Sequence, residues 1–350
     1  MRYSVLRNCK DRLIFHFRQC QPRPVISWLL LSAALLTAAS LPGYFLQNTA
    51  ASTPAVVQSA QQAQAGPQSI SPDAVQTITL LTENDSQHLS LEEYLIGVVF
   101  AEMPPSFEVE ALKAQAVAAR TYTLNKMQNS RHAGALCSDS SCCQAWINDA
   151  ACREKYGEQY PEWYEKISDA VRATSGLVLL YHGQLIDATY FSSSGGKTED
   201  AAAVWGNDVP YLISVESPEP DAPHRSDSVS IPFTQFCDMI HTIASDADLS
   251  GNPAGWFGAQ TATAGGGVDT LEIGGILFSG TDLRSLFSLR STAFTVEIAP
   301  DSIVFTTTGN GHRVGMSQYG ANAMAAAGND FRAILTHYYS GVEIKNAVPT

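Results

Sequence analysis

The chain has 350 residues, 45% of them hydrophobic, and a net charge of −13 at neutral pH. This length and composition can bury a sizeable core, in one domain or in two closely packed lobes. The acidic balance argues against nucleic acid or a general anionic surface as the partner, so any contact with an anionic polymer must be local.

A basic segment at the N-terminus precedes a long apolar one. Residues 1–24 contain six Lys and Arg side chains against a single acid, Asp11, and residues 25–46 contain no charge. An apolar run of this length can cross a bilayer as a helix, and the basic flank favours a cytoplasmic N-terminus. We expect a single-pass transmembrane helix at 25–46, with 1–24 in the cytoplasm. A cleaved signal peptide is the alternative, because small residues follow the apolar core.

Residues 47–75 consist mainly of Ala, Gln, Ser, Thr and Pro, a composition that cannot build a core. We predict a flexible tether there, followed by one extracellular α+β domain of two closely packed lobes over 76–348. Without residues 1–24, the count of basic residues falls from 21 to 15 and that of acidic residues from 34 to 33, a net charge of −18. The folded domain is therefore more acidic than the whole chain.

A capping box opens a predicted helix at residue 90. Ser90 is followed three residues later by Glu93, so each side chain can bond to the other residue's backbone N–H. Apolar residues then recur at spacings of four and three, and two prolines at 104–105 end the helix. Glu102 falls on the apolar face beside that break, where desolvation suits a general acid near neutral pH. A glutamate that merely caps the helix or forms an ion pair is the alternative.

A second, alanine-rich helix is predicted over 109–127. Lys113 and Arg120 lie two turns apart on one face of it, and Tyr122 lies on another face. Two cations on the helix that follows Glu102 can hold an acidic group of a ligand, and Arg is the better bidentate partner. The alternative is that both cations are solvated, or that Arg120 pairs with an acid and only stabilises the fold.

The two helices lie in a run that resembles the signature of the stage II sporulation protein D family, EEYLIGVVFAEMPPSFEVEALKAQAVAARTY. Members of this family are membrane-anchored lytic transglycosylases of bacterial peptidoglycan. Their catalytic acid is the Glu of an AEMP motif. The resemblance therefore implies that Glu102 is the catalytic acid of this chain.

Four residues of metal-ligating types follow the second helix: His132, Cys137, Cys142 and Cys143. Zinc takes four thiolate or imidazole ligands in a tetrahedron, so we expect a structural zinc site that fixes the loop near the catalytic acid. Disulfide bonds are the alternative outside the cell, although the five cysteines of this part cannot all pair. Some family members bind zinc here with two His and two Cys. Cys142 stands in place of their second His, and Cys152 is the substitute ligand.

A hairpin and a Ser-Gly loop are predicted in the middle of the domain. The run LVLLYHGQLIDATYF, residues 177–191, reads as two strands around a turn. Ser193 and Ser194 follow it in a stretch that also resembles the family, and their hydroxyl and backbone N–H groups can face a sugar. The alternative is a plain linker. Trp205 and Tyr211 can stack on a sugar or simply pack in the core. Residues 250–267 are predicted as a surface loop.

The last motif is a glycine-rich loop that should enter a helix near residue 317. Its sequence, GHRVGMSQYGA, resembles the family's GHGVGMSQYGA, with Arg313 in place of the second Gly. If that Gly has a positive φ in relatives, Arg313 implies a different turn. Such a loop exposes backbone N–H groups to a ligand. We expect His312, Gln318 and Tyr319 beside the cleft, with a structural role for His312 as an equal alternative.

The resemblance covers roughly residues 78–344 and implies cleavage of the MurNAc–GlcNAc bond in peptide-free glycan strands during engulfment in sporulation. One acid suffices if the sugar's own 6-hydroxyl attacks and forms 1,6-anhydro-MurNAc, whereas a hydrolase normally needs two carboxylates. The expected substrate contacts are Lys113, Arg120, Tyr122, Ser193, Ser194, His312, Gln318 and Tyr319.

The expected setting is the cytoplasmic membrane at the sporulation septum. Expected partners are the glycan strands, the membrane itself, a cell-wall amidase and other engulfment membrane proteins, but no nucleic acid. Two alternatives remain open at this point. One is a non-catalytic wall-binding activator of an N-acetylmuramoyl-L-alanine amidase, and the other is a zinc-dependent hydrolase.

Overall fold

The computed structural model describes residues 71–82, 85–129, 132–140, 142–223 and 226–347. The predicted cytoplasmic segment, the predicted transmembrane helix and nearly all of the predicted tether lie outside the described residues. Within the described ranges, no helix is long and apolar enough to cross a membrane. This part of the chain is a mixed α/β structure with two separate hydrophobic cores, which confirms the predicted mixture of helices and strands.

The capping box predicted at the start of the first helix is present. The Ser90 hydroxyl accepts a hydrogen bond from the Glu93 N–H across 3.2 Å, and the Glu93 carboxylate accepts one from the Ser90 N–H across 2.8 Å. Helix α2 (Leu91–Glu102) therefore begins at residue 91. Met103 has an extended backbone and ends the helix before the two prolines, so Glu102 is its last residue.

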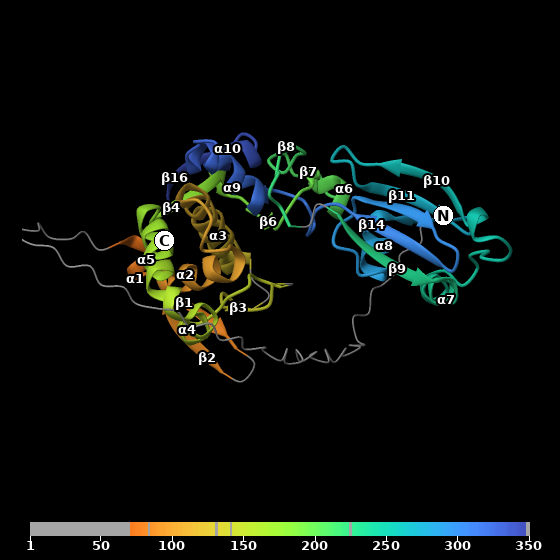
Figure 1. Ribbon diagram of the computed structural model, residues 1–350. Helices are drawn as coiled ribbons and strands as arrows, with labels where there is room; N and C mark the ends of the chain where they lie inside the picture. Colours follow the sequence, from red (N-terminus) through yellow and green to blue (C-terminus); the bar gives the residue numbers. More distant parts are fainter. Residues whose placement is uncertain (1–70, 83–84, 130–131, 141, 224–225, 348–350) are drawn as a thin grey trace, which may run out of the picture. The chain divides into compact units, whose positions relative to one another are not determined.

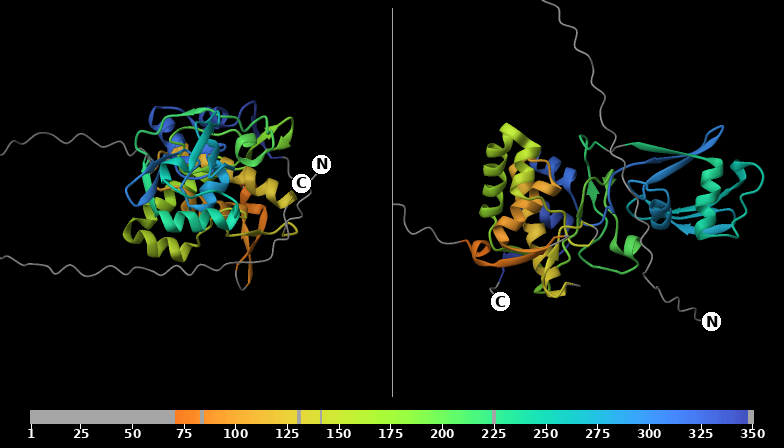
Figure 2. Two further views of the ribbon diagram at one scale, coloured as in Figure 1. Left: turned by 90° about the vertical axis from the view of Figure 1, so that its right-hand side faces the viewer. Right: turned by 90° about the horizontal axis from the view of Figure 1, so that it is seen from below.

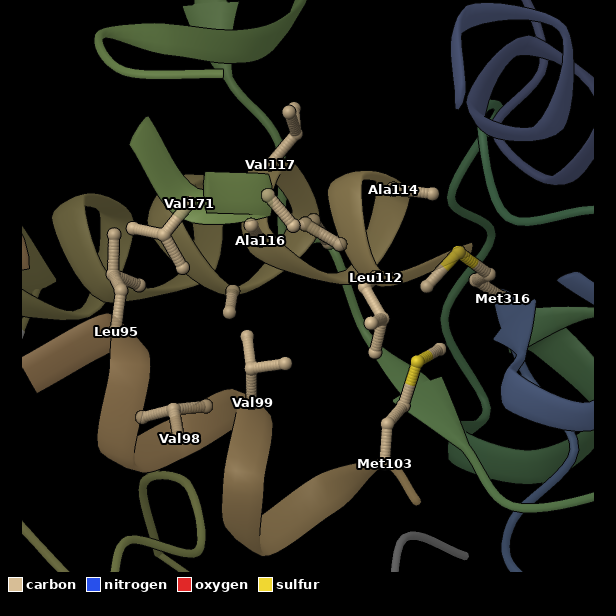
Figure 3. Packing of buried hydrophobic residues seen from close by; sticks show 14 of the residues in the cluster. Leu95, Val98, Val99, Met103, Leu112, Ala114, Ala116, Val117, Val171 and Met316 are labelled. Carbon is tan, nitrogen blue, oxygen red and sulfur yellow. The ribbon is translucent and has the colours of Figure 1, made fainter. Parts of the chain in front are cut away.

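Helix α3 (Val109–Asn129) is the centre of the first lobe, which we define as residues 71–223 and 308–347 (Figure 1). Buried alanines on α3 let the neighbouring backbones approach closely, and Figure 3 shows Val99 and Met103 of α2 facing Ala116 and Leu112 of α3. The other helices that pack on α3 are α5 (Tyr160–Ala173), α9 (Gln318–Ala326) and α10 (Phe331–Tyr338).

Short strands tie the C-terminal motif to the middle of the chain. Strand β6 (Tyr190–Phe191) pairs in parallel with β15 (Met316–Ser317). The predicted hairpin is only partly right, because β4 (Leu177–Tyr181) pairs with β5 (Gln184–Leu185) and residues 186–189 then leave that sheet. The remaining elements of the first lobe are α1 (Pro72–Val75), β1 (Thr77–Leu81), β2 (Ser86–Ser90), β3 (Leu136–Cys137), α4 (Asp149–Tyr156), η1 (Gly157–Gln159), β7 (Gly196–Lys197), α6 (Ala201–Trp205), β8 (Glu216–Ser217) and β16 (Glu343–Asn346).

The second lobe, residues 226–307, has its own core, in which the Phe236 ring stacks on Trp256 and Phe287. Its strands and helices form one group in the right-hand view of Figure 2. Part of the predicted surface loop at 250–267 is a strand. The sequence did not indicate it, because its mostly exposed residues do not alternate between apolar and polar. The elements are β9 (Asp227–Pro232), α7 (Phe233–Ile243), η2 (Pro253–Gly255), β10 (Phe257–Ala262), β11 (Val268–Ile273), β12 (Ile276–Ser279), α8 (Gly280–Leu286), β13 (Phe294–Ile298) and β14 (Ser302–Thr307), in sheets β10-β11-β12 and β13-β14-β9.

The end of the predicted tether needs a correction. Residues 72–75 form helix α1, and the Asp73 side chain is buried against the first lobe. Its carboxylate lies 2.7 Å from Nη2 of Arg120 in the middle of α3. The folded part therefore begins before residue 76, because a buried ion pair anchors the segment that composition alone marks as tether.

Candidate active site

Glu102 stands at the end of α2 with both carboxylate oxygens bound by donors from distant segments. The Ala145 N–H donates to Oε1 across 3.1 Å, and Nε2 of Gln318 donates to Oε2 across 3.4 Å. Burial raises the pKa of the Glu102 carboxyl, and the two hydrogen bonds oppose that shift because they favour the anion. Glu102 is therefore held in one orientation and protonates more readily than an ordinary glutamate.

The pairing of β6 with β15 places Gln318 next to Glu102. Ser317 caps α9, since its hydroxyl accepts a hydrogen bond from the Gly320 N–H across 3.2 Å, so Gln318 is the first residue of that helix. The Tyr319 N–H donates to the Ser192 carbonyl across 3.0 Å, and its ring meets Phe107 edge to face at 4.9 Å. The structure thus places Gln318 beside the Glu102 carboxylate and places Tyr319 beside Phe107, shortly after Glu102 in the chain.

A network of polar side chains beneath the acid escaped the sequence analysis. The Tyr190 hydroxyl donates to Oε1 of Gln144 across 2.7 Å, and Nε2 of Gln144 donates to the Thr123 hydroxyl across 2.8 Å. Burial is the main cause that raises the pKa of Tyr190, and the negative charge of Glu102 is the next. In the sequence, only the position of Gln144 directly after a predicted metal ligand pointed to this network. The pairing of β6 with β15, which positions Tyr190, has no signal in the local sequence.

A cavity of about 480 Å³ opens beside Glu102. The end of α2 and the turn 104–106 form one wall of it, and α4, η1 and α5 form the other. Glu102 is the sole acidic residue among the described residues that line this cavity. Its other side-chain walls come from residues absent from the predicted site: Phe100, Lys155, Tyr156, Gln159 and Trp163.

The four predicted metal ligands meet in one cluster, which we call the Cys–His cluster: His132, Cys137, Cys142 and Cys143. One ligand atom of each lies within 4.8 Å of all the others, and Nε2 of His132 is 3.2 Å from Sγ of Cys142. The cysteines of the described residues are free thiols, and Cys152 lies outside the cluster. Tetrahedral zinc with Zn–S bonds of about 2.3 Å fits donors gathered this closely.

Arg120 is corrected as a substrate contact. Its guanidinium is fully buried, pairs with Asp73 and donates to the carbonyls of Leu177 and Val171, each across 3.2 Å. With its donors engaged inside the core, Arg120 is not available to a polymer in the cleft. The alternative role, stabilising the fold through an acid, is the one that the structure supports.

Lys113 and Tyr122 also lie away from the acid's hydrogen bonds. The Lys113 ammonium is 2.6 Å from Oε1 of Glu110, one turn earlier on α3. The ring of Tyr122 lies 4.7 Å from the Lys126 ammonium, and burial raises the pKa of its hydroxyl. Neither residue lines the cavity beside Glu102.

Ser193 and Ser194 are buried rather than open to a ligand. The Ser194 N–H and hydroxyl both donate to the buried carboxylate of Glu219, at 2.9 Å and 2.5 Å. The Ser317 hydroxyl donates to the same carboxylate across 2.5 Å, so Glu219 joins the Ser-Gly loop to the N-terminus of α9. Within the part of the chain that the structure describes, the Ser193 hydroxyl is buried without a hydrogen-bond partner.

His312 is partly buried, and its ring is held by neighbouring groups. Nδ1 accepts a hydrogen bond from the Val314 N–H across 3.1 Å, and the ring packs near Phe191 and Trp205. Burial, followed by the positive charge of Arg284, lowers the pKa of His312 to about 4. These contacts support the structural role rather than a place beside Glu102.

Arg313 adopts the left-handed backbone, with φ of 66°, that its glycine counterpart would favour. The guanidinium forms a buried ion pair with Glu199 at 3.0 Å and donates to the Gly265 carbonyl of the second lobe across 2.7 Å. These bonds hold the strained residue in place.

Comparisons with known proteins identify the family of this chain. A family model described as "Stage II sporulation protein" matches residues 82–181. The chain is 36% identical over 307 residues to "Stage II sporulation protein D" of Bacillus subtilis (strain 168), covering 86% of each chain. It is 38% identical over 272 residues to the protein of that name from Bacillus amyloliquefaciens, covering 76% of this chain and 77% of the relative.

A third relative carries a different name. The chain is 30% identical over 300 residues to the "Amidase enhancer" of Bacillus subtilis (strain 168), which covers 71% of this chain and 40% of that protein. The long matches to both sporulation proteins, together with the family model, establish the relationship. This chain belongs to the Stage II sporulation protein D family.

Proposed function

We propose that this protein is a lytic transglycosylase that cleaves the MurNAc–GlcNAc bond of peptide-free glycan strands during sporulation. The observation that carries the proposal is a single oriented acid at a cavity. Glu102 has a raised pKa and is the sole acidic residue among the described residues lining that cavity. The nearby Glu93 is engaged in the capping box, and Glu92 pairs with Arg172 at 2.9 Å.

One carboxyl group can carry both proton transfers of such a reaction. The protonated Glu102 gives its proton to the glycosidic oxygen while the bond from that oxygen to C1 of MurNAc breaks. The 6-hydroxyl oxygen of the same MurNAc then bonds to C1, and its proton returns to Glu102. The products are a free 4-hydroxyl on GlcNAc and a 1,6-anhydro-MurNAc end, and no water is consumed. The raised pKa favours the protonated acid that starts this cycle.

Zinc in the Cys–His cluster is part of the proposal. His132, Cys137, Cys142 and Cys143 would hold the ion, which would supply cross-linking of the loop that runs from 132 to 145. Four protein ligands leave no open position for a water molecule, which argues against the zinc-dependent hydrolase. The chain's own contribution is to hold the Ala145 N–H against Glu102.

The proposed setting is the outer face of the cytoplasmic membrane at the sporulation septum, with residues 25–46 as anchor. A second function is kept because of one observation, the similarity to a protein named amidase enhancer. In that function the protein would bind the wall and activate a partner N-acetylmuramoyl-L-alanine amidase without cutting glycan itself.

Digestion of peptide-free glycan by the full-length protein in water enriched in ¹⁸O tests the proposal. Mass spectrometry should find 1,6-anhydro ends that carry no label, because the attacking oxygen comes from the sugar. Labelled reducing ends would identify a hydrolase. Unchanged glycan, together with faster release of stem peptides when a partner amidase is added, would identify the activator.

A further inference from the structure

The cavity beside Glu102 has a wall that no part of the proposed reaction uses. Residues of α4, η1 and α5 form it, and they lie 53 to 61 positions after the acid in the chain. They include an exposed cation, Lys155, and a half-buried indole, Trp163, with Tyr156 and Gln159 between them. The cations predicted from the sequence to meet the substrate, Lys113 and Arg120, do not line this cavity.

The two lysines near this wall have different tasks. Lys166 lies 5.4 Å from the Trp163 ring and donates to the carbonyls of Pro105 and Phe107 across 2.9 Å and 2.6 Å. Its ammonium group is therefore occupied in holding the turn after Glu102. Lys155 lies 4.9 Å from the Tyr156 ring and, among the described residues, has no ion-pair partner. Its charge is free to meet a ligand inside the cavity.

Charge and shape together indicate what this cavity binds. The domain is strongly acidic, and Glu154, Glu158 and Glu162 stand exposed on the same helices, so a free cation at the cavity is a local exception that suits an anionic group. Aromatic rings present flat apolar faces on which the C–H groups of a sugar ring can stack. The amide of Gln159 can bond to an N-acetyl group, because it both donates and accepts.

We propose that this cavity is the glycan subsite next to the cleaved bond, with Trp163 stacking on a sugar ring and Lys155 pairing with the lactyl carboxylate of MurNAc. The inference rests on the proposed function and adds the source of its specificity. Chitin has the same N-acetylated sugars but lacks the lactyl carboxylate. The wall formed by α4, η1 and α5 therefore binds MurNAc-containing strands in preference to chitin.

Binding measured in the Glu102→Gln background tests the subsite without turnover. The ligands are peptide-free MurNAc–GlcNAc oligomers and chitin oligomers of equal length, titrated by calorimetry against the full-length protein in detergent. Adding Lys155→Gln should weaken binding of the MurNAc oligomer about five- to tenfold, the usual effect of losing a charge-assisted bond, and leave chitin unchanged. Adding Trp163→Ala should weaken binding of both ligands.

Two matched variants serve as controls. Arg153→Gln removes a positive charge from the same helix outside the cavity, and Leu277→Ala removes an exposed apolar side chain of the second lobe. Both should bind the two oligomers like the background protein. Because Lys155 is exposed, its substitution leaves the fold intact even if Trp163→Ala lowers the melting temperature.

The proposal is overturned if Lys155→Gln changes the affinity for both ligands equally, or the affinity for neither of them. It is also overturned if Arg153→Gln reproduces the selective loss, because a general surface charge would then explain it. Failure of the proposed reaction is a separate result: wild-type protein would yield no 1,6-anhydro ends, while the selective effect of Lys155→Gln on binding would still be measured.

Discussion

The backbone N–H of Ala145 donates to Oε1 of Glu102 across 3.1 Å, and Ala145 follows the cluster residue Cys143 by two positions. Residues 142–143 are tied to Asp139 by backbone hydrogen bonds of 3.0 and 2.8 Å. The loop that gathers the Cys–His cluster therefore also aims a donor at the acid. A change in that loop should reach Glu102 even though none of its ligands touches the carboxylate.

The first prediction concerns the cluster itself. Cys137→Ser should remove one bound zinc per chain and lower the melting temperature, because the binding energy of a structural metal is folding energy. Metal analysis and thermal unfolding of the same preparation measure the two effects. Cys237→Ser, a thiol of the second lobe, is the control and should change neither. A disulfide between cluster cysteines in the native protein would refute this assignment.

The second prediction uses a glycine that the loop needs. A Cβ at Gly97 would lie 2.3 Å from Nε1 of Trp146 and 2.7 Å from the Ile147 carbonyl. Gly97→Ala should push this part of the loop away from α2, destabilise the fold by about 1–3 kcal/mol and reduce the cleavage rate. Denaturant unfolding and a rate assay measure both. Gly255→Ala is the control, and it should change neither the free energy of unfolding nor the cleavage rate because the space around Gly255 is open. A fully active Gly97→Ala would mean that Ala145 does not position Glu102.

The third prediction concerns the buried pair of Arg120 and Asp73. Arg120→Ala should lower the free energy of unfolding by about 3–5 kcal/mol, because it leaves an uncompensated buried carboxylate. A double-mutant cycle with Asp73→Asn should show strong coupling between the two sites. Any loss of binding affinity should be the same for MurNAc oligomers and for chitin oligomers. A loss confined to the MurNAc oligomers would restore Arg120 as a substrate contact.

Local signals account for what the sequence predicted well. The capping box, the proline break and the spacing of His132 and the cysteines are each encoded within a few residues, and the structure has α2 and the cluster as expected. Arg120 was misjudged because its partner, Asp73, lies 47 residues earlier in a segment that composition marks as tether. The contact of Ala145 with Glu102 spans 43 residues and has no local signature.

The same limit applies to the cavity. Lys155 and Trp163 sit on helices with ordinary amphipathic patterns. Only the packing of α5 beside α2, and of α4 against α5, brings them to the acid. The parallel pairing of β6 with β15 joins residues more than a hundred positions apart. Patterns along the chain therefore identify the acid and the metal ligands, but tertiary packing decides what surrounds them.

The fourth prediction is a pH dependence of stability from His312. Its pKa is about 4 in the folded protein against an ordinary value of 6.5, so the unfolded chain takes up the proton first as the pH falls. Wild-type protein should lose about 3 kcal/mol of stability between pH 6.5 and pH 4 from this group and none above pH 6.5. His312→Asn keeps an acceptor for the Val314 N–H, and its stability should not show this loss between pH 6.5 and pH 4.

His182→Asn provides the control for this pH profile, because His182 is an exposed turn residue. It should follow the wild-type curve in urea unfolding at each pH. If the stability of His312→Asn instead falls with pH as the wild-type stability does, burial does not lower the pKa of His312 in the folded protein.

Glu102→Gln is the most direct test of the central claim, that one half-buried acid carries the reaction. The variant keeps the shape of the side chain but cannot transfer a proton, so the fold and glycan binding should persist. Production of 1,6-anhydro-MurNAc ends from peptide-free glycan should fall at least about 100-fold, the usual contribution of a general acid. A variant that still forms these ends at more than a few per cent of the wild-type rate would contradict the account.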